Sequence, residues 1–92
     1  MIVDVTNDEA LAEIKRLAGV PWRIVWTSHA TRRMRDRKAF EQDVINALLT
    51  STTARWQADH QSWAVDGGVD VDGDDLGVRV NIEADLIIRT VY

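Results

Sequence analysis

One short segment of the chain concentrates the side chains that could do chemistry. Residues 28–38 hold one histidine, four arginines and one lysine. If this segment is helical, His29 lies one turn from Arg32 and Arg33, and Arg33 lies one turn from Arg37. An imidazole moves protons near neutral pH, and guanidinium groups bind phosphate and stabilise a developing anion. A ribonuclease that works without a metal ion needs these parts: a base, an acid and cations for the phosphate.

The end of the chain supplies a second group. Arg89 would join Arg79 of the preceding strand, and Tyr92 offers a hydroxyl that can donate a proton. The predicted catalytic residues are His29, Arg33, Arg37, Arg89 and Tyr92, and the predicted phosphate-binding residues are Arg32, Arg33 and Arg37. Two simpler interpretations stay open. The basic helix could be a solvated surface, and the strand end could be an edge with Arg89 paired to a local acid.

Two other motifs are weaker indications of a functional site. Residues 70–75 resemble the start of a calcium loop, but its sixth position is Asp75 instead of glycine and its twelfth is Asn81 instead of glutamate. A polar hairpin is the preferred interpretation, with a weak cation site as the alternative. His29 and His60 lack the spacing of metal ligands, and we expect His60 to be an exposed turn residue. We therefore expect no metal and no cofactor.

Length and composition restrict the class of protein. The chain of 92 residues predicts one domain, residues 1–92. The absence of cysteine excludes disulfides and thiolate metal sites. No apolar run approaches the roughly 20 residues that span a bilayer, and the first residues do not resemble a signal peptide. We expect a cytoplasmic protein that does not enter a membrane.

The net charge of −4 is unevenly distributed. Residues 15–58 carry +6, whereas residues 1–14 carry −4 and residues 59–92 carry −6. A basic middle between acidic ends permits an anionic ligand at one place. The same pattern argues against a protein that coats nucleic acid over its whole surface.

The hydrophobic pattern predicts an α+β fold. Thr6 and Glu9 form a capping box before a helix, and Gly19 follows its end. The predicted helices are residues 7–18, 29–37 and 40–50, and the predicted strands are residues 22–27, 53–58, 63–71, 76–82 and 86–92. We expect a bulge at Gly67 and Gly68 and a turn at Asp72 and Gly73. The helices would cover the apolar face of a small antiparallel sheet.

The aromatic side chains add expectations about the core. Trp22, Trp26 and Trp63 fall on apolar strand faces, and Phe40 begins the apolar stripe of the third helix, so we expect all four to be buried. Trp56 lies in a weak strand, where it would close the edge of the core, contribute to an interface or stack a base. In the last strand, simple alternation places Ile87, Arg89 and Val91 on one face.

The segment around His29 resembles a known protein family. The matching residues are His29-Ala30-x-x-Arg33-Met34-x-x-Arg37, Asp43-Val44-x-x-Ala47-Leu48 and the terminal Ile87-Ile88-Arg89-Thr90-Val91-Tyr92. This pattern, over residues 24–92, resembles a bacterial domain family of unknown function that is akin to the RelE, ParE and BrnT toxins. This chain departs from RelE-like toxins in its acidic net charge and in the absence of a Ser or Asp cap before the third helix.

The resemblance implies a RelE-like toxin fold of helices on a small antiparallel sheet. In that superfamily, RelE-like members cleave messenger RNA on the ribosome and ParE-like members act on gyrase. The implied partners are therefore RNA or a ribosome, and an antitoxin or a host protein. Three functions are expected in order of preference. The first is a toxin-like ribonuclease, and the second is a non-catalytic protein-binding module, either a phage or mobile-element protein or an inactive relative of such a toxin. The last is an antitoxin or DNA-binding regulator, because no helix-turn-helix is evident.

Overall fold

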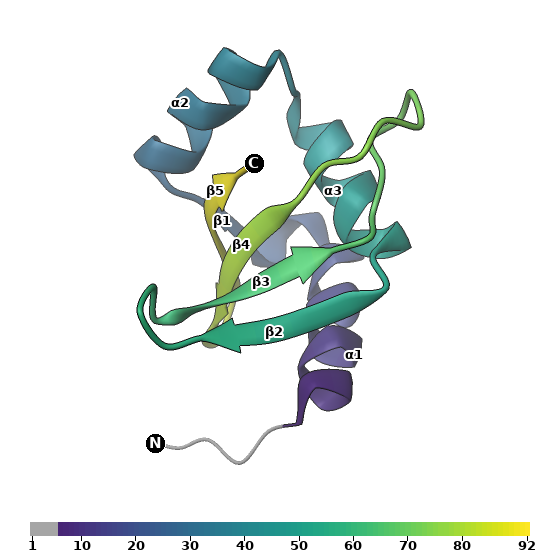
Figure 1. The fold of residues 1–92 in the computed structure, drawn as a ribbon. Helices are drawn as coiled ribbons and strands as arrows, with labels where there is room; N and C mark the ends of the chain where they lie inside the picture. The colour runs from purple at the N-terminus through teal and green to yellow at the C-terminus, as the bar shows by residue number, and fades with distance from the viewer. Residues whose placement is uncertain (1–5) are drawn as a thin grey trace.

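This computed structural model describes residues 6–92, in which the fold is built on a five-stranded mixed sheet with three helices packed on it (Figure 1). The elements in chain order are α1 (Asn7–Ala18), the 3₁₀ turn η1 (Pro21–Arg23), β1 (Ile24–Trp26), α2 (Ser28–Arg37), α3 (Glu41–Thr50), β2 (Thr53–Gln57), β3 (Ser62–Asp66), β4 (Val78–Ile82) and β5 (Leu86–Val91). The expected α+β class is confirmed.

The sheet has the strand order β1-β5-β4-β3-β2. Strands β2 to β5 pair antiparallel, but β1 pairs parallel with β5, so the prediction of a wholly antiparallel sheet is wrong at one edge. The reason is topological. Short turns fix the direction of consecutive strands, whereas β1 and β5 are separated by most of the chain and no turn joins them.

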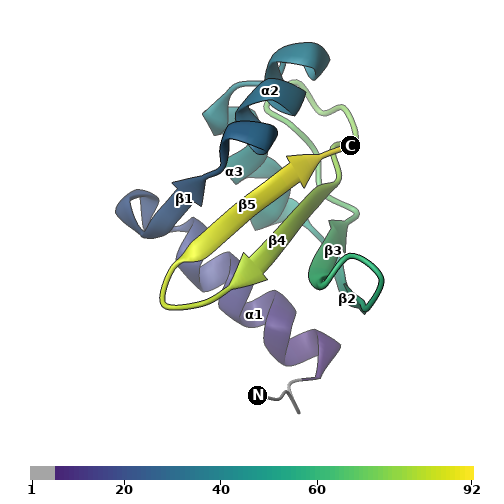
Figure 2. The ribbon, with the colours of Figure 1, turned by 90° about the vertical axis from the view of Figure 1, so that its left-hand side faces the viewer.

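Helices α1 and α3 cover one face of the sheet, and their apolar side chains form the core with it (Figures 1 and 2). Ile14, Leu48, Val80 and Ile88 are completely buried there. On the opposite side, no helix of the described part of the chain lies in front of β4 and β5 (Figure 2). The sheet therefore has one packed face and one open face.

Local capping explains where the first helix begins. The Thr6 hydroxyl accepts the Glu9 N–H at 3.1 Å, and the Glu9 carboxylate accepts the Thr6 N–H at 2.9 Å, as the sequence predicts.

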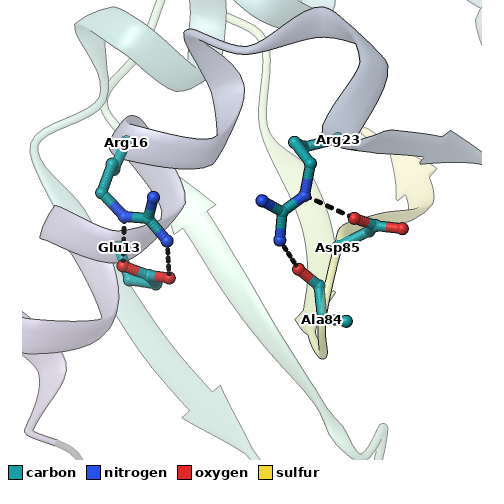
Figure 3. A network of polar contacts seen from close by, with 5 residues as sticks. All are labelled: Glu13, Arg16, Arg23, Ala84 and Asp85. Atoms are coloured by element: carbon teal, nitrogen blue, oxygen red, sulfur yellow. Dashed lines mark hydrogen bonds and ion pairs between the residues drawn. The ribbon is translucent and has the colours of Figure 1, made fainter.

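Beyond α1, the Arg23 Nε donates to Asp85 at 2.6 Å and its Nη2 donates to the Ala84 carbonyl (Figure 3). This contact ties the start of β1 to the turn before β5.

Two aromatic residues are exposed instead of buried. Trp22 is 83% exposed because Pro21 starts a 3₁₀ turn, so the strand begins at Ile24 and its alternation does not reach Trp22. Phe40 is 76% exposed because it lies just before α3, where its N–H donates to the Asp43 carboxylate at 2.8 Å. The other two expected core tryptophans, Trp26 and Trp63, pack in or against the core.

The third expected strand is also shorter than predicted. β3 ends at Asp66 because Gly67 adopts φ 85°, which breaks the alternation. Gly68 then passes against α3, where a Cβ would lie 1.8 Å from the Ala47 carbonyl oxygen. The two glycines therefore end the strand and do not form the expected bulge. The Asp70 carboxylate accepts the N–H groups of residues 72 and 74, which gives the acidic loop, residues 70–75, a structural role.

Candidate active site

A cleft of about 610 Å³ lies between the first turns of α2 and the open face of the sheet. Helix α2, the β2–β3 turn and three strands contribute to it. The lining residues are Thr27, Ser28, His29, Arg33, His60, Ser62, Arg79, Arg89, Thr90, Val91 and Tyr92. Its volume lies within the range of cavities that bind small ligands, about 300–1,000 Å³.

Thr27 holds the start of α2 against the sheet. Its hydroxyl accepts the Ala30 N–H at 3.1 Å and donates to the Ile88 carbonyl of β5 at 2.7 Å. The same hydroxyl is thus the N-cap of α2 and its link to β5. His29 and Arg33, four residues apart, lie on the helix face that lines the cleft, while Ala30 is buried.

A bulge in β5 re-aims the end of the chain. Arg79 pairs with Thr90 and Val80 pairs with Ile88, so Arg89 is an extra residue in the ladder. The expected grouping of Ile87, Arg89 and Val91 is therefore wrong: Val91 is buried and Arg89 is exposed. Because the bulge breaks simple alternation, Arg89, Thr90 and Tyr92 all line the cleft.

Tyr92 and Arg79 form a fixed polar wall. The Tyr92 hydroxyl donates to Asp66 at 2.8 Å, and the Arg79 guanidinium lies 5.2 Å from the centroid of the Tyr92 ring. Arg79 also donates from Nη2 to the Gln57 side chain at 2.5 Å. The ring fits because Gly77 has no side chain: a Cβ there would lie 2.3 Å from a ring carbon.

The environment of Tyr92 keeps its hydroxyl protonated. Partial burial, the hydrogen bond to Asp66 and the charge of that carboxylate together raise the pKa of Tyr92 to about 12. The positive charges of Arg79 and Arg55 act in the opposite direction. Near neutral pH this phenol is therefore a hydrogen-bond donor and not a base.

Four of the predicted catalytic residues meet in the cleft: His29, Arg33, Arg89 and Tyr92. Arg32 and Arg37 do not line it. Arg32 precedes Arg33 on the helix and so points about 100° away from it around the axis. Arg37 is the last residue of α2, one turn beyond Arg33 and further from the helix start that borders the cleft.

The cleft includes residues that could not be assigned to it from the sequence, among them His60 and Ser62. His60 is exposed and in a turn, as expected, but that turn brings its imidazole to the cleft opposite α2. Ser62 is the buried first residue of β3. Neither has a local signal, because their position depends on the register of β3 against β4 and on where α2 docks. The polar alternation of β3 was the only pattern that could have suggested Ser62.

The charge of the cleft is positive. Arg33, Arg79 and Arg89 contribute three guanidinium groups, and no aspartate or glutamate is among its lining residues within the described chain. Across residues 6–92, no three His, Asp or Glu side chains gather in a group that could hold a metal ion. The cleft thus combines imidazoles, cations and hydroxyl donors, a set suited to an anionic ligand.

Comparisons with protein-family models, with curated proteins and with solved structures find no match for this chain. The toxin resemblance of the His29 motif therefore stays a prediction. None of the helices in residues 6–92 is both long and apolar enough to cross a membrane.

Proposed function

We propose that the protein is a small toxin-like ribonuclease that cleaves RNA in the cleft beside α2. One observation supports this function above the others. Segments far apart in the sequence bring two imidazoles, His29 and His60, to the same cleft as three guanidinium groups. A solvated basic helix would not need matching groups on the sheet, so the gathering itself favours a site for a phosphate ester.

The proposed reaction is a transesterification. The neutral imidazole of His29 takes the proton of the ribose 2′-hydroxyl, and the 2′-oxygen forms a bond to phosphorus. The bond from phosphorus to the 5′-oxygen breaks, and protonated His60 gives that oxygen a proton. Arg33 and Arg89 stabilise the extra negative charge on the phosphoryl oxygens. The products are a 2′,3′-cyclic phosphate and a 5′-hydroxyl.

The test is cleavage of a short RNA by purified protein, alone and in a separate reaction with translating ribosomes. We expect His29→Asn to lower the cleavage rate about 10²–10⁴-fold, the usual contribution of a general base. Arg33→Ala should lower it about 10²-fold or more, because it removes charge stabilisation in the transition state. A strand with 2′-deoxyribose at the cleaved position should stay intact.

Arg35→Ala is the matched control, because Arg35 is an exposed arginine of the same helix and does not line the cleft. We expect this variant to cleave like the wild type. Circular dichroism checks that every variant is folded. In a bacterial host, induced wild type should arrest growth and folded His29→Asn should not. Wild-type cleavage by folded His29→Asn, or no cleavage in either reaction, refutes the proposal.

A separate observation favours a second candidate function, a non-catalytic protein-binding module. Phe40 and Val71 are exposed apolar residues whose N–H groups both donate to the carboxylate of Asp43, at 2.8 and 3.2 Å. Val71 belongs to the acidic loop and Phe40 is linked to it through Asp43, so a basic partner with an apolar contact would fit. This function predicts a stoichiometric complex that Phe40→Ser weakens, with no turnover of RNA.

A further inference from the structure

Two buried polar atoms in the cleft have no hydrogen-bond partner within residues 6–92. They are the Ser62 hydroxyl and the Arg79 Nε. Ser62 is 1% exposed, and both residues line the cleft. Buried polar groups in folded proteins are nearly always paired, because an unpaired one loses its bonds to water without replacement.

A second buried serine shows the contrast. Ser51 is 2% exposed, but its hydroxyl donates to the Leu48 carbonyl at 2.6 Å at the end of α3. Ser51 does not line the cleft. The two serines are equally buried, yet only the one in the cleft lacks a partner. Its unpaired hydroxyl is therefore not a general property of buried serines in this fold.

The register of the sheet explains how Ser62 and Arg79 come together. Gln57 of β2 pairs directly with Ser62 of β3, and Arg79 of β4 pairs with Ala64. Because the Arg79 guanidinium reaches the Gln57 side chain, it crosses β3 on the same face as Ser62. The Tyr92 ring and Gln57 hold this guanidinium in place, so its free Nε is a pre-positioned donor.

We propose that Ser62 and the Arg79 Nε form the floor of a phosphate subsite, where both donate hydrogen bonds to a phosphoryl oxygen of the ligand. Both groups can donate, and an anionic oxygen can accept from both at once. The guanidinium groups of Arg33 and Arg89 line the same cleft and add positive charge to it. This inference deepens the ribonuclease proposal and rests on it for the class of ligand, but it concerns binding and is tested without turnover.

The experiment is an NMR titration of the protein with inorganic phosphate and with a nucleoside 3′-monophosphate. We expect Ser62→Ala to weaken both affinities at least about tenfold, the usual effect of losing a hydrogen bond to a charged group. Arg79→Lys, which keeps the charge but removes Nε, should weaken them similarly. The matched control Ser51→Ala should leave both affinities unchanged.

Thermal melting of the free variants gives a second readout. Ser62→Ala should melt at the wild-type temperature or higher, because it removes an unpaired hydroxyl, whereas Ser51→Ala should melt lower. Unchanged phosphate affinity in Ser62→Ala overturns the inference, as does a loss of melting temperature like that of Ser51→Ala.

The ligand controls separate a phosphate from a nucleobase. If a nucleoside without phosphate binds in a Ser62-dependent way and phosphate does not, the floor recognises a base carbonyl and the proposal is wrong. The two proposals also fail separately. Ser62-dependent phosphate binding without RNA cleavage supports the subsite and refutes the ribonuclease, whereas cleavage that Ser62→Ala leaves untouched, with unchanged phosphate affinity, refutes only the subsite.

Discussion

At the scale of single residues, Tyr92 shows how the chain end takes part in the site. Its hydroxyl donates to Asp66, and the Arg79 guanidinium lies over its ring in a cation–π contact. The hydrogen bond and the burial both favour the protonated phenol. Tyr92 therefore positions the Arg79 guanidinium and acts as a hydrogen-bond donor near neutral pH.

The first prediction concerns the titration of this phenol. The wild-type pKa should be about 12, and Asp66→Asn should lower it toward 10, because the variant loses the carboxylate charge. Tyrosinate absorbance measures this directly, since the chain has one tyrosine. Asp59→Asn, which removes an exposed carboxylate of the β2–β3 turn, should leave the pKa of Tyr92 unchanged. A wild-type pKa near 10 would contradict the partly buried, hydrogen-bonded phenol.

The same shift has a consequence for stability. The folded state holds the Tyr92 proton more tightly than the unfolded chain, whose tyrosine titrates near 10. The resulting stabilisation is complete below pH 10 and is lost as the pH rises through about 12. Urea denaturation at pH 9 and above should show this loss, and it should be smaller in Asp66→Asn.

At the scale of elements, features that depend on neighbouring residues could be predicted from the sequence, whereas features that depend on strand register could not. The α1 capping box and the spacing of His29 and Arg33 on α2 depend only on neighbouring residues, so both could be predicted from the sequence. The β5 bulge and the parallel pairing of β1 depend on segments distant in the chain. The sequence could therefore identify Arg89 and Tyr92 as candidate site residues. It could not show that both line the same cleft, or that His60 joins them there.

Thr27 makes the contact that fixes the position of α2 relative to β5, and with it the positions of the side chains on α2. Thr27→Val keeps the shape but removes the hydroxyl that caps α2 and bonds β5. We expect the free energy of unfolding to fall by about 1–2 kcal/mol, as for other N-cap losses. We also expect RNA cleavage to fall, because His29 and Arg33 lose their fixed distance from the sheet. Urea denaturation and the cleavage assay measure the two effects.

Two further variants test this interpretation. Thr27→Ser keeps the hydroxyl and should retain both stability and cleavage. Thr31→Val makes the same substitution one turn later, where the exposed hydroxyl bonds only the Thr27 carbonyl of its own helix, so its effect should be small. Equal losses in Thr27→Val and Thr31→Val would show that the link to β5 is unimportant.

At the scale of the whole molecule, the charge is divided between two regions. The net charge is −4, yet the cleft carries three arginines. The acidic loop between β3 and β4 projects beside α3, away from α2 (Figure 1). A nucleic-acid strand should therefore meet positive charge at the cleft and along the neighbouring α2, and negative charge at the acidic loop, which confines binding to one side of the molecule.

This confinement predicts a shallow dependence of affinity on salt. Each neutralised phosphate of a single strand contributes about −0.7 to the slope of log K against log salt concentration, so three arginine contacts give about −2. A single-stranded DNA probe measures this slope without cleavage, because it lacks the 2′-hydroxyl. Arg33→Ala should make the slope shallower by about 0.7, and Arg35→Ala should leave it unchanged. A much steeper slope that both variants reduce equally would mean that the strand lies along the exposed helix instead of in the cleft.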